Sequence, residues 1–125
     1  MDNLSLEKTK STLGINFDWD TGILELSGSS YPENAFEFFN PLMSWLKSYM
    51  TEKKKPIELN ISISYLNTSS TKCMIDLVLL LEDYFQSGCP VSINWYYVYD
   101  DESILETGQE IREDTTFSFQ LICVN

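Results

Sequence analysis

The sequence contains no histidine. Imidazole is the commonest general base at neutral pH and the commonest metal ligand. Its absence excludes every nucleophile that depends on histidine for activation, including the serine and cysteine triads. Catalysis by carboxylates or by lysine stays open in principle. A binding protein is therefore favoured over an enzyme.

Cysteine is also scarce, at three residues. Cys73, Cys89 and Cys123 are widely spaced, odd in number and without a CxxC pair, so neither a disulfide framework nor a zinc site is expected. Residues 1–12 are polar and lack the apolar core of a signal peptide. No apolar run approaches the roughly 20 residues that span a bilayer. These absences predict a cytoplasmic protein with no membrane partner, metal or other cofactor.

Basic residues are few as well, eight against nineteen acidic ones, for a net charge of −11. So acidic a surface repels phosphate backbones and anionic lipid, which excludes nucleic acid as a partner. It suits a basic protein surface, or it serves solubility alone. The 125 residues, 43% of them hydrophobic, fit one domain over 1–125. A domain of this size needs no disulfide or metal to stay folded. Residues 1–12 are expected to form a loose arm or an edge strand.

Alternating apolar and polar residues predict five strands. Residues 15–19 and 24–26 form a hairpin around an Asp-x-Gly turn. The other strands cover 57–65, 91–99 and 117–123. Apolar residues at steps of three and four predict helices in the intervening segments.

The predicted helices cover about 32–53, 69–86 and, more briefly, 103–112. Pro41 cannot donate to a carbonyl four residues earlier, so the first helix is expected to kink or to have a broken first turn. Gly88 and Pro90 end the second helix.

The resulting order is β-β-α-β-α-β-(α)-β, an α/β fold with a mixed sheet. Strands covered by helices on both faces read as continuous apolar runs, whereas these strands alternate. Helices are therefore expected mainly on one face of the sheet. A doubly wound dinucleotide-binding fold is excluded, since no glycine-rich phosphate loop follows any strand.

The segment from Tyr65 to Thr71 links the end of a central strand to the start of a helix, where functional groups of open α/β sheets gather. One interpretation is that Asn67 or Thr68 caps the helix and the other hydroxyls merely follow. The other is a phosphoacceptor. A phosphate there would meet free N–H groups and the positive end of the helix dipole. It would also add about −1.5 to −2 charge, enough to abolish a protein contact.

A second polar segment leads into the first long helix. Ser30 can cap that helix, Pro32 suits its first turn and Glu33 complements its dipole. Tyr31 and Asn34 are left as candidates for surface recognition. The acidic residues within 100–102 and 110–114 read as a solvated face rather than a paired-carboxylate active site.

Three tracts together carry a family resemblance: Ser30-Tyr31-Pro32-Glu33-Asn34, Tyr65-Leu66-Asn67-Thr68-Ser69-Ser70, and Arg112-Glu113-Asp114 with Phe117 and Phe119. Through them the chain, from about Ser11 onward, resembles the SiaC family of bacterial regulatory phosphoproteins. These are relatives in fold of the STAS anti-sigma-factor antagonists, so the resemblance implies a STAS-like mixed sheet.

The resemblance also implies a non-catalytic partner switch. A threonine that falls on Thr68 is phosphorylated by a dedicated kinase and dephosphorylated by a PP2C-like phosphatase. The unmodified form binds and activates a diguanylate cyclase, raising cyclic di-GMP as in biofilm regulation. Candidate partner-binding residues around this phosphoacceptor are Tyr31, Glu33, Asn34, Tyr65, Asn67, Ser69 and Ser70.

Two other functions stay open. Within the binding class, the protein could instead sequester an anti-sigma-factor kinase, as STAS antagonists do. Within the enzyme class, it could be a small carboxylate-dependent hydrolase, against which stand the missing histidine and the lack of a motif.

Overall fold

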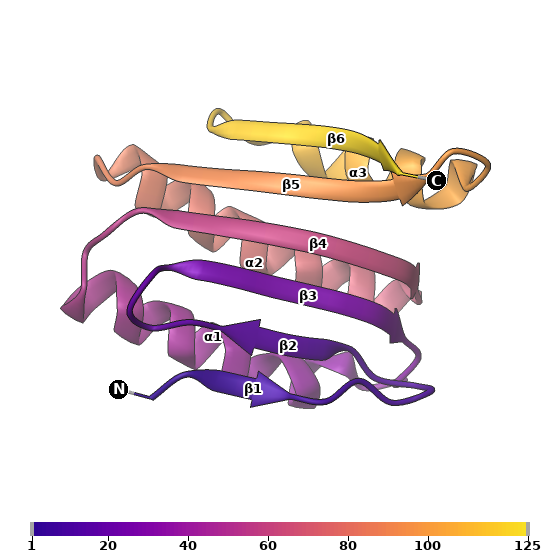
Figure 1. Ribbon diagram of the computed structural model, residues 1–125, viewed down its shortest axis with the longest axis horizontal. Helices are drawn as coiled ribbons and strands as arrows, with labels where there is room; N and C mark the ends of the chain where they lie inside the picture. Colours follow the sequence, from indigo (N-terminus) through magenta and orange to yellow (C-terminus); the bar gives the residue numbers. More distant parts are fainter. Residues whose placement is uncertain (1, 125) are drawn as a thin grey trace.

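The computed structural model describes residues 2–124 and shows one sheet with three helices (Figure 1). The strands are β1 (Leu4–Leu6), β2 (Gly14–Phe17), β3 (Ile23–Ser30), β4 (Ile57–Leu66), β5 (Val91–Val98) and β6 (Ser118–Val124). The helices are α1 (Ala35–Glu52), α2 (Thr68–Gln86) and α3 (Glu102–Arg112). The predicted order of strands and helices is confirmed, with β1 placed ahead of the hairpin.

The six strands lie side by side in the order in which they occur along the chain. The pairs β1–β2 and β2–β3 are antiparallel, and β3–β4, β4–β5 and β5–β6 are parallel. The turn between β2 and β3 is closed by Asp18, whose Oδ1 accepts hydrogen bonds from the N–H groups of Asp20 and Thr21. Gly22 follows at φ 71°, where a Cβ would lie 2.3 Å from the Pro56 carbonyl oxygen. This turn therefore requires glycine.

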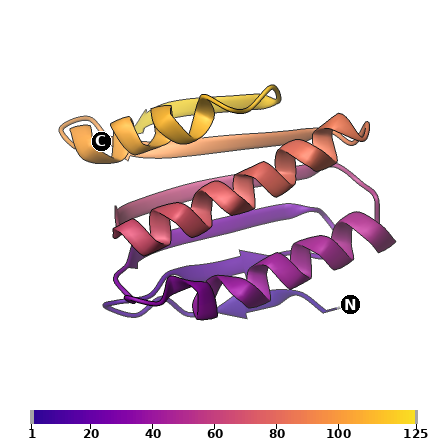
Figure 2. The same ribbon diagram turned by 180° about the vertical axis from the view of Figure 1, so that it is seen from behind.

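All three helices cover the same face of the sheet (Figures 1 and 2). The strand side chains that point toward them are buried, among them Leu24, Ile61 and Trp95. Below α1 the core is aromatic: the Trp19 ring packs edge-on against Trp45 and Tyr49 at centroid distances of 5.5 and 5.4 Å. The predicted one-sided arrangement is confirmed.

Within residues 2–124 no helix covers the opposite face of the sheet, and its central part carries polar side chains. One row of paired residues crosses five strands: Asn16, Glu25, Asn60, Asn94 and Gln120. Within it, the Asn94 Nδ2 donates to the Asn60 Oδ1 at 2.9 Å. These amides can face water because side chains alternate along each strand.

Helix α1 differs from its prediction in two ways. It begins at Ala35, three residues after Pro32, so Pro32 lies before the first turn. It also runs unbroken through Pro41 to Glu52, and the predicted broken first turn is wrong. Pro41 and Glu37 are both exposed, so water can satisfy the carbonyl that proline leaves without a donor. Among residues 2–124, no helix combines the length and the apolar content needed to cross a membrane.

Candidate functional site

The candidate site lies where β3 and β4 end beside each other and α2 begins. Ser30 pairs with Leu66 at the last position of the two strands. One residue later, the Asn67 N–H donates to the Ser30 carbonyl oxygen at 3.1 Å. This carboxyl edge of the parallel strands therefore brings residues 30–32 next to residues 67–71.

Asn67 is the N-cap of α2 and also holds the neighbouring loop. Its Oδ1 accepts from the Ser70 N–H at 2.8 Å, as expected of a cap. Its Nδ2 donates to the carbonyl oxygens of Tyr31 at 2.8 Å and Pro32 at 2.9 Å. The side chain thus uses both donor hydrogens and its acceptor, joining the β3–α1 loop to the start of α2.

Two serines that follow the cap make further ties to the same loop. Ser70 is fully buried, and its hydroxyl is hydrogen-bonded to that of buried Ser30 at 2.6 Å. The Ser69 Oγ accepts from the Ala35 N–H at 3.1 Å. Asn34, the N-cap of α1, makes no side-chain cap bond, so α1 is capped by a residue of α2. Ser30 does not cap α1, and that prediction is wrong because its side chain points into the core.

Thr68 is exposed at the first position of α2. Among the described residues 2–124, its hydroxyl takes part in no hydrogen bond, unlike the side chains of Asn67, Ser69, Ser70 and Thr71. Among the serine and threonine hydroxyls of residues 68–71, it is therefore the one that the fold leaves without a hydrogen bond. Phosphate attached there would lie at the positive end of the helix dipole.

Lys72 adds a cation to this environment. It is exposed and lies four residues after Thr68, hence on the same helix face. Sequence reasoning missed this neighbour, although the spacing of four along a predicted helix was visible. An ammonium group here can pair with a phosphate on Thr68 or with an acidic group of a kinase or partner.

Beside Thr68 lies a pair of exposed tyrosines. The rings of Tyr31 and Tyr65 stack with centroids 4.5 Å apart and an interplanar angle of 21°. Their side chains remain 51% and 42% exposed. Tyrosine pairs of this kind supply large rigid contact area at protein interfaces. The Tyr31 backbone is fixed in place, because the Asn67 Nδ2 donates to its carbonyl oxygen.

The structure thus brings together Tyr31, Tyr65, Asn67, Thr68 and Ser69 at one edge. Ser70, also predicted as partner-binding, is fully buried and cannot touch a partner in this conformation. Glu33 and Asn34 are exposed in the loop before α1.

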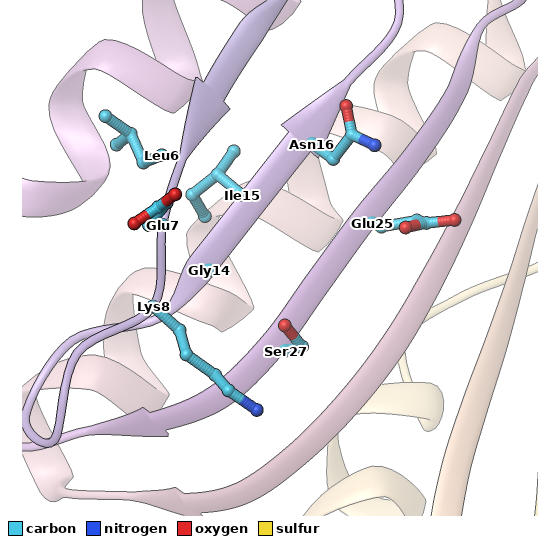
Figure 3. A pocket seen from close by; sticks show the side chains of 8 residues that line it. All are labelled: Leu6, Glu7, Lys8, Gly14, Ile15, Asn16, Glu25 and Ser27. Carbon is cyan, nitrogen blue, oxygen red and sulfur yellow. The ribbon is translucent and has the colours of Figure 1, made fainter.

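Several shallow hollows lie on the open sheet face, and two of them cross its polar part. The one in Figure 3, of about 390 Å³, is lined by strands β1 to β3. Its charged side chains, Glu7, Lys8 and Glu25, point in different directions, so they form no carboxylate pair (Figure 3). The second, of about 410 Å³, continues across Asn60 and Asn94. Among the described residues no group of three or more His, Cys, Asp or Glu side chains could hold a metal ion.

The chain is a small mixed α/β domain. Its candidate site presents one threonine hydroxyl at the start of a helix, beside a pair of exposed tyrosines. The model of the SiaC family regulatory phosphoproteins matches residues 6–124. The chain is 40% identical over 121 residues to an uncharacterized protein of Pseudomonas aeruginosa strain UCBPP-PA14, covering 97% of this chain and 96% of that protein.

Solved structures agree with this match. SiaC of Pseudomonas aeruginosa is 39% identical with a TM-score of 0.93, over 99% of this chain and 100% of that one. A second structure shows SiaC as activator in complex with the diguanylate cyclase SiaD. It is 40% identical with a TM-score of 0.92, over 97% of this chain and 99% of that one. The chain therefore belongs to the SiaC family of regulatory phosphoproteins.

Proposed function

We propose that this protein is a cytoplasmic, non-catalytic partner switch controlled by phosphorylation of Thr68. Its unphosphorylated form binds and activates a diguanylate cyclase, and phosphorylation releases the cyclase. A protein kinase adds the phosphate and a PP2C-like phosphatase removes it. The supporting observation is Thr68 itself, exposed at the start of α2 with a hydroxyl that makes no hydrogen bond within residues 2–124.

The geometry supports a switch that leaves the fold intact. A phosphate on Thr68 adds about −1.5 to −2 charge at the positive end of the α2 dipole, where the fold tolerates it. A partner bound to the Tyr31–Tyr65 pair would have that charge at the edge of its contact surface. Like charge or lost packing on the partner side then weakens the complex.

The cyclase is the proposed effector because a family member, the SiaC of Pseudomonas aeruginosa, is its activator in a solved complex. The tyrosine pair and Thr68 are both exposed at the same edge of the sheet, which is suitable for such a contact. The protein acts as substrate and ligand.

The test compares Thr68→Ala and Thr68→Asp in binding to, and activation of, the cyclase from the same host. We expect Thr68→Ala to keep activation, and Thr68→Asp to weaken binding by about tenfold or more, equivalent to about 1.4 kcal/mol. The matched control is Ser103→Asp, which places the same charge at another exposed hydroxyl in a helix first turn. It should bind normally.

The intact mass of protein from its own host gives the number of phosphates, and fragmentation of the same protein locates them. Phosphate only on another residue, or equal cyclase binding by both Thr68 variants, would contradict the mechanism. Capture of a sigma-factor regulator in place of a cyclase would overturn the effector while leaving the switch.

A further inference from the structure

Strand β6 forms one edge of the sheet, and no other strand of residues 2–124 pairs with its outer side. It is seven residues long, and Figure 1 shows it running uncovered along the upper edge. The residues from Thr115 to Val124 include no charge and no proline. Edge strands usually carry lysine, proline or a bulge that prevents further pairing. This edge has none of these.

The opposite edge of the sheet is different. Strand β1 has only three residues, and the charged residues Glu7 and Lys8 follow it directly. Shortness and charge are both devices that block strand addition. The two edges of one sheet therefore differ in their readiness to accept another strand.

Beside the β6 edge, the open sheet face changes from polar to apolar. Tyr96 pairs with Ile122 and Val98 with Val124, so these four side chains form a patch at one corner. Val98 and Val124 are 43% and 40% exposed. An added strand would place alternate side chains against Ile122 and Val124, because residues two apart share a face.

Acidic groups lie at both ends of this edge. Exposed Glu113 and Asp114 are in the loop that leads into β6. Exposed Asp100 and Glu102 follow the end of β5, whose Val98 pairs with Val124 at the end of β6. The edge is thus a neutral strand with negative charge at each end.

These charges decide between possible occupants. If two copies of this chain paired through β6, acidic groups would face acidic groups at both ends, whether the strands ran parallel or antiparallel. Repulsion within a chain of net charge −11 disfavours that dimer. A foreign strand with an apolar centre and lysine or arginine at each end has complementary charge.

We propose that the outer edge of β6 is a second protein-binding site, which takes an extended, basic-ended segment of a partner as an additional strand. The site is separate from Thr68, because β6 lies two strands from the end of β4, about 10 Å away across the sheet. Binding there does not depend on the phosphorylation state of Thr68.

The probe is a short synthetic peptide of alternating valine and threonine with a lysine–arginine pair at each end. Titration into ¹⁵N-labelled protein should shift the amides of residues 118–124 saturably. A peptide methylated on alternate backbone nitrogens along its pairing edge should not bind, because its donors are removed. A peptide with glutamates at the ends should bind at least about tenfold more weakly.

Variants locate the site. Val124→Lys should weaken the basic peptide about tenfold or more, as a charge on an edge strand does. The matched control is Leu6→Lys, an exposed leucine on the opposite edge, 42% accessible, which should leave binding unchanged. Thr68→Asp should also leave it unchanged, so failure of the partner switch and failure of this site are distinguishable.

Absence of saturable binding, or shifts confined to other strands, would overturn the proposal. So would sedimentation showing that the protein dimerises and that Val124→Lys makes it monomeric, since the occupant would then be a second copy.

Discussion

The buried hydroxyls of Ser30 and Ser70 connect the end of β3 to the first turn of α2. Both side chains are fully buried, and the residues are 40 positions apart in the chain. Neither hydroxyl is accessible to water as an alternative partner. The pair therefore positions Thr68, which precedes Ser70 by two residues, relative to the tyrosine-bearing loop.

The two single substitutions in this pair should together lower the free energy of unfolding by more than the double substitution does. Ser70→Ala leaves the buried Ser30 hydroxyl without its partner and should lower the free energy of unfolding by about 1–3 kcal/mol. Ser30→Ala should cost less, because the Ser70 hydroxyl keeps the carbonyl oxygen of residue 30, at 3.4 Å, as an acceptor. The double variant should be destabilised by less than the sum, because no unpaired hydroxyl remains. Urea unfolding of the four proteins measures this. Strict additivity would show that the hydroxyls act independently.

At the same scale, the sequence predicted a cap at Asn67 or Thr68, of which the structure has Asn67, but it did not predict the hydrogen bonds around it. A cap is a local property, set by residues three apart. The contacts of Ser30 with Ser70, and of Ser69 with Ala35, depend on how β3 and β4 align. No local pattern reports that alignment. Ser30 was accordingly assigned to the wrong helix end, and Ser70 to the surface.

Among the elements, α2 is joined to the loop before β6 by Glu82. Its carboxylate accepts from the Thr116 N–H at 2.7 Å, the Thr116 hydroxyl at 2.6 Å and the Gln86 amide at 2.7 Å. The Thr116 and Gln86 side-chain hydrogen bonds lower the pKa of the Glu82 carboxyl below its ordinary value of 4.5. These bonds favour the ionised form.

This contact predicts a pH dependence of stability. Because folding lowers the pKa of Glu82, its contribution is present above the ordinary pKa of 4.5 that the group has when unfolded, and is lost as pH falls through the folded pKa. Glu82→Gln should therefore be less stable than wild type near neutral pH, and the difference should shrink in acid. Unfolding midpoints along a pH series test this. A gap that stays constant or widens toward low pH would contradict it.

Elements were predictable here because the two hydrophobic periods differ clearly. Strict alternation over residues 57–65 can bury only one face, which predicted helices on a single side. The prediction at Pro41 failed because the sequence shows that proline lacks an N–H, but does not show that the Glu37 carbonyl left without a donor faces water. Hydrophobic periodicity does not determine how strands align, so neither their register nor the row of polar residues across them could be predicted.

On the scale of the whole molecule, the excess of negative charge opposes compactness. Nineteen acidic residues against eight basic ones repel one another in the folded state. Salt screens this repulsion, the Debye length falling from about 30 Å at 0.01 M to about 8 Å at 0.15 M. We expect the urea midpoint to rise over that range of sodium chloride.

A charge-reduced variant is the control. Glu106→Gln with Glu110→Gln removes two exposed acidic groups of α3. Its midpoint should start higher in dilute buffer and respond less to salt. A midpoint that is flat or falls with salt in the wild type would mean that local attractive pairs outweigh the general repulsion.

The match between strand order and chain order has a consequence for synthesis. As the chain leaves the ribosome, every new strand finds its neighbour already made, and no strand must be threaded between two others. Each strand can therefore pair with the strand before it as soon as it is made, and each helix can pack on the strands that precede it. Each parallel pair must still close a chain segment that contains a whole helix, so these pairings remain long-range and slow the search. Strand β6 pairs only after β5 and α3 have been made, so a chain that lacked β6 would expose the side of β5 instead.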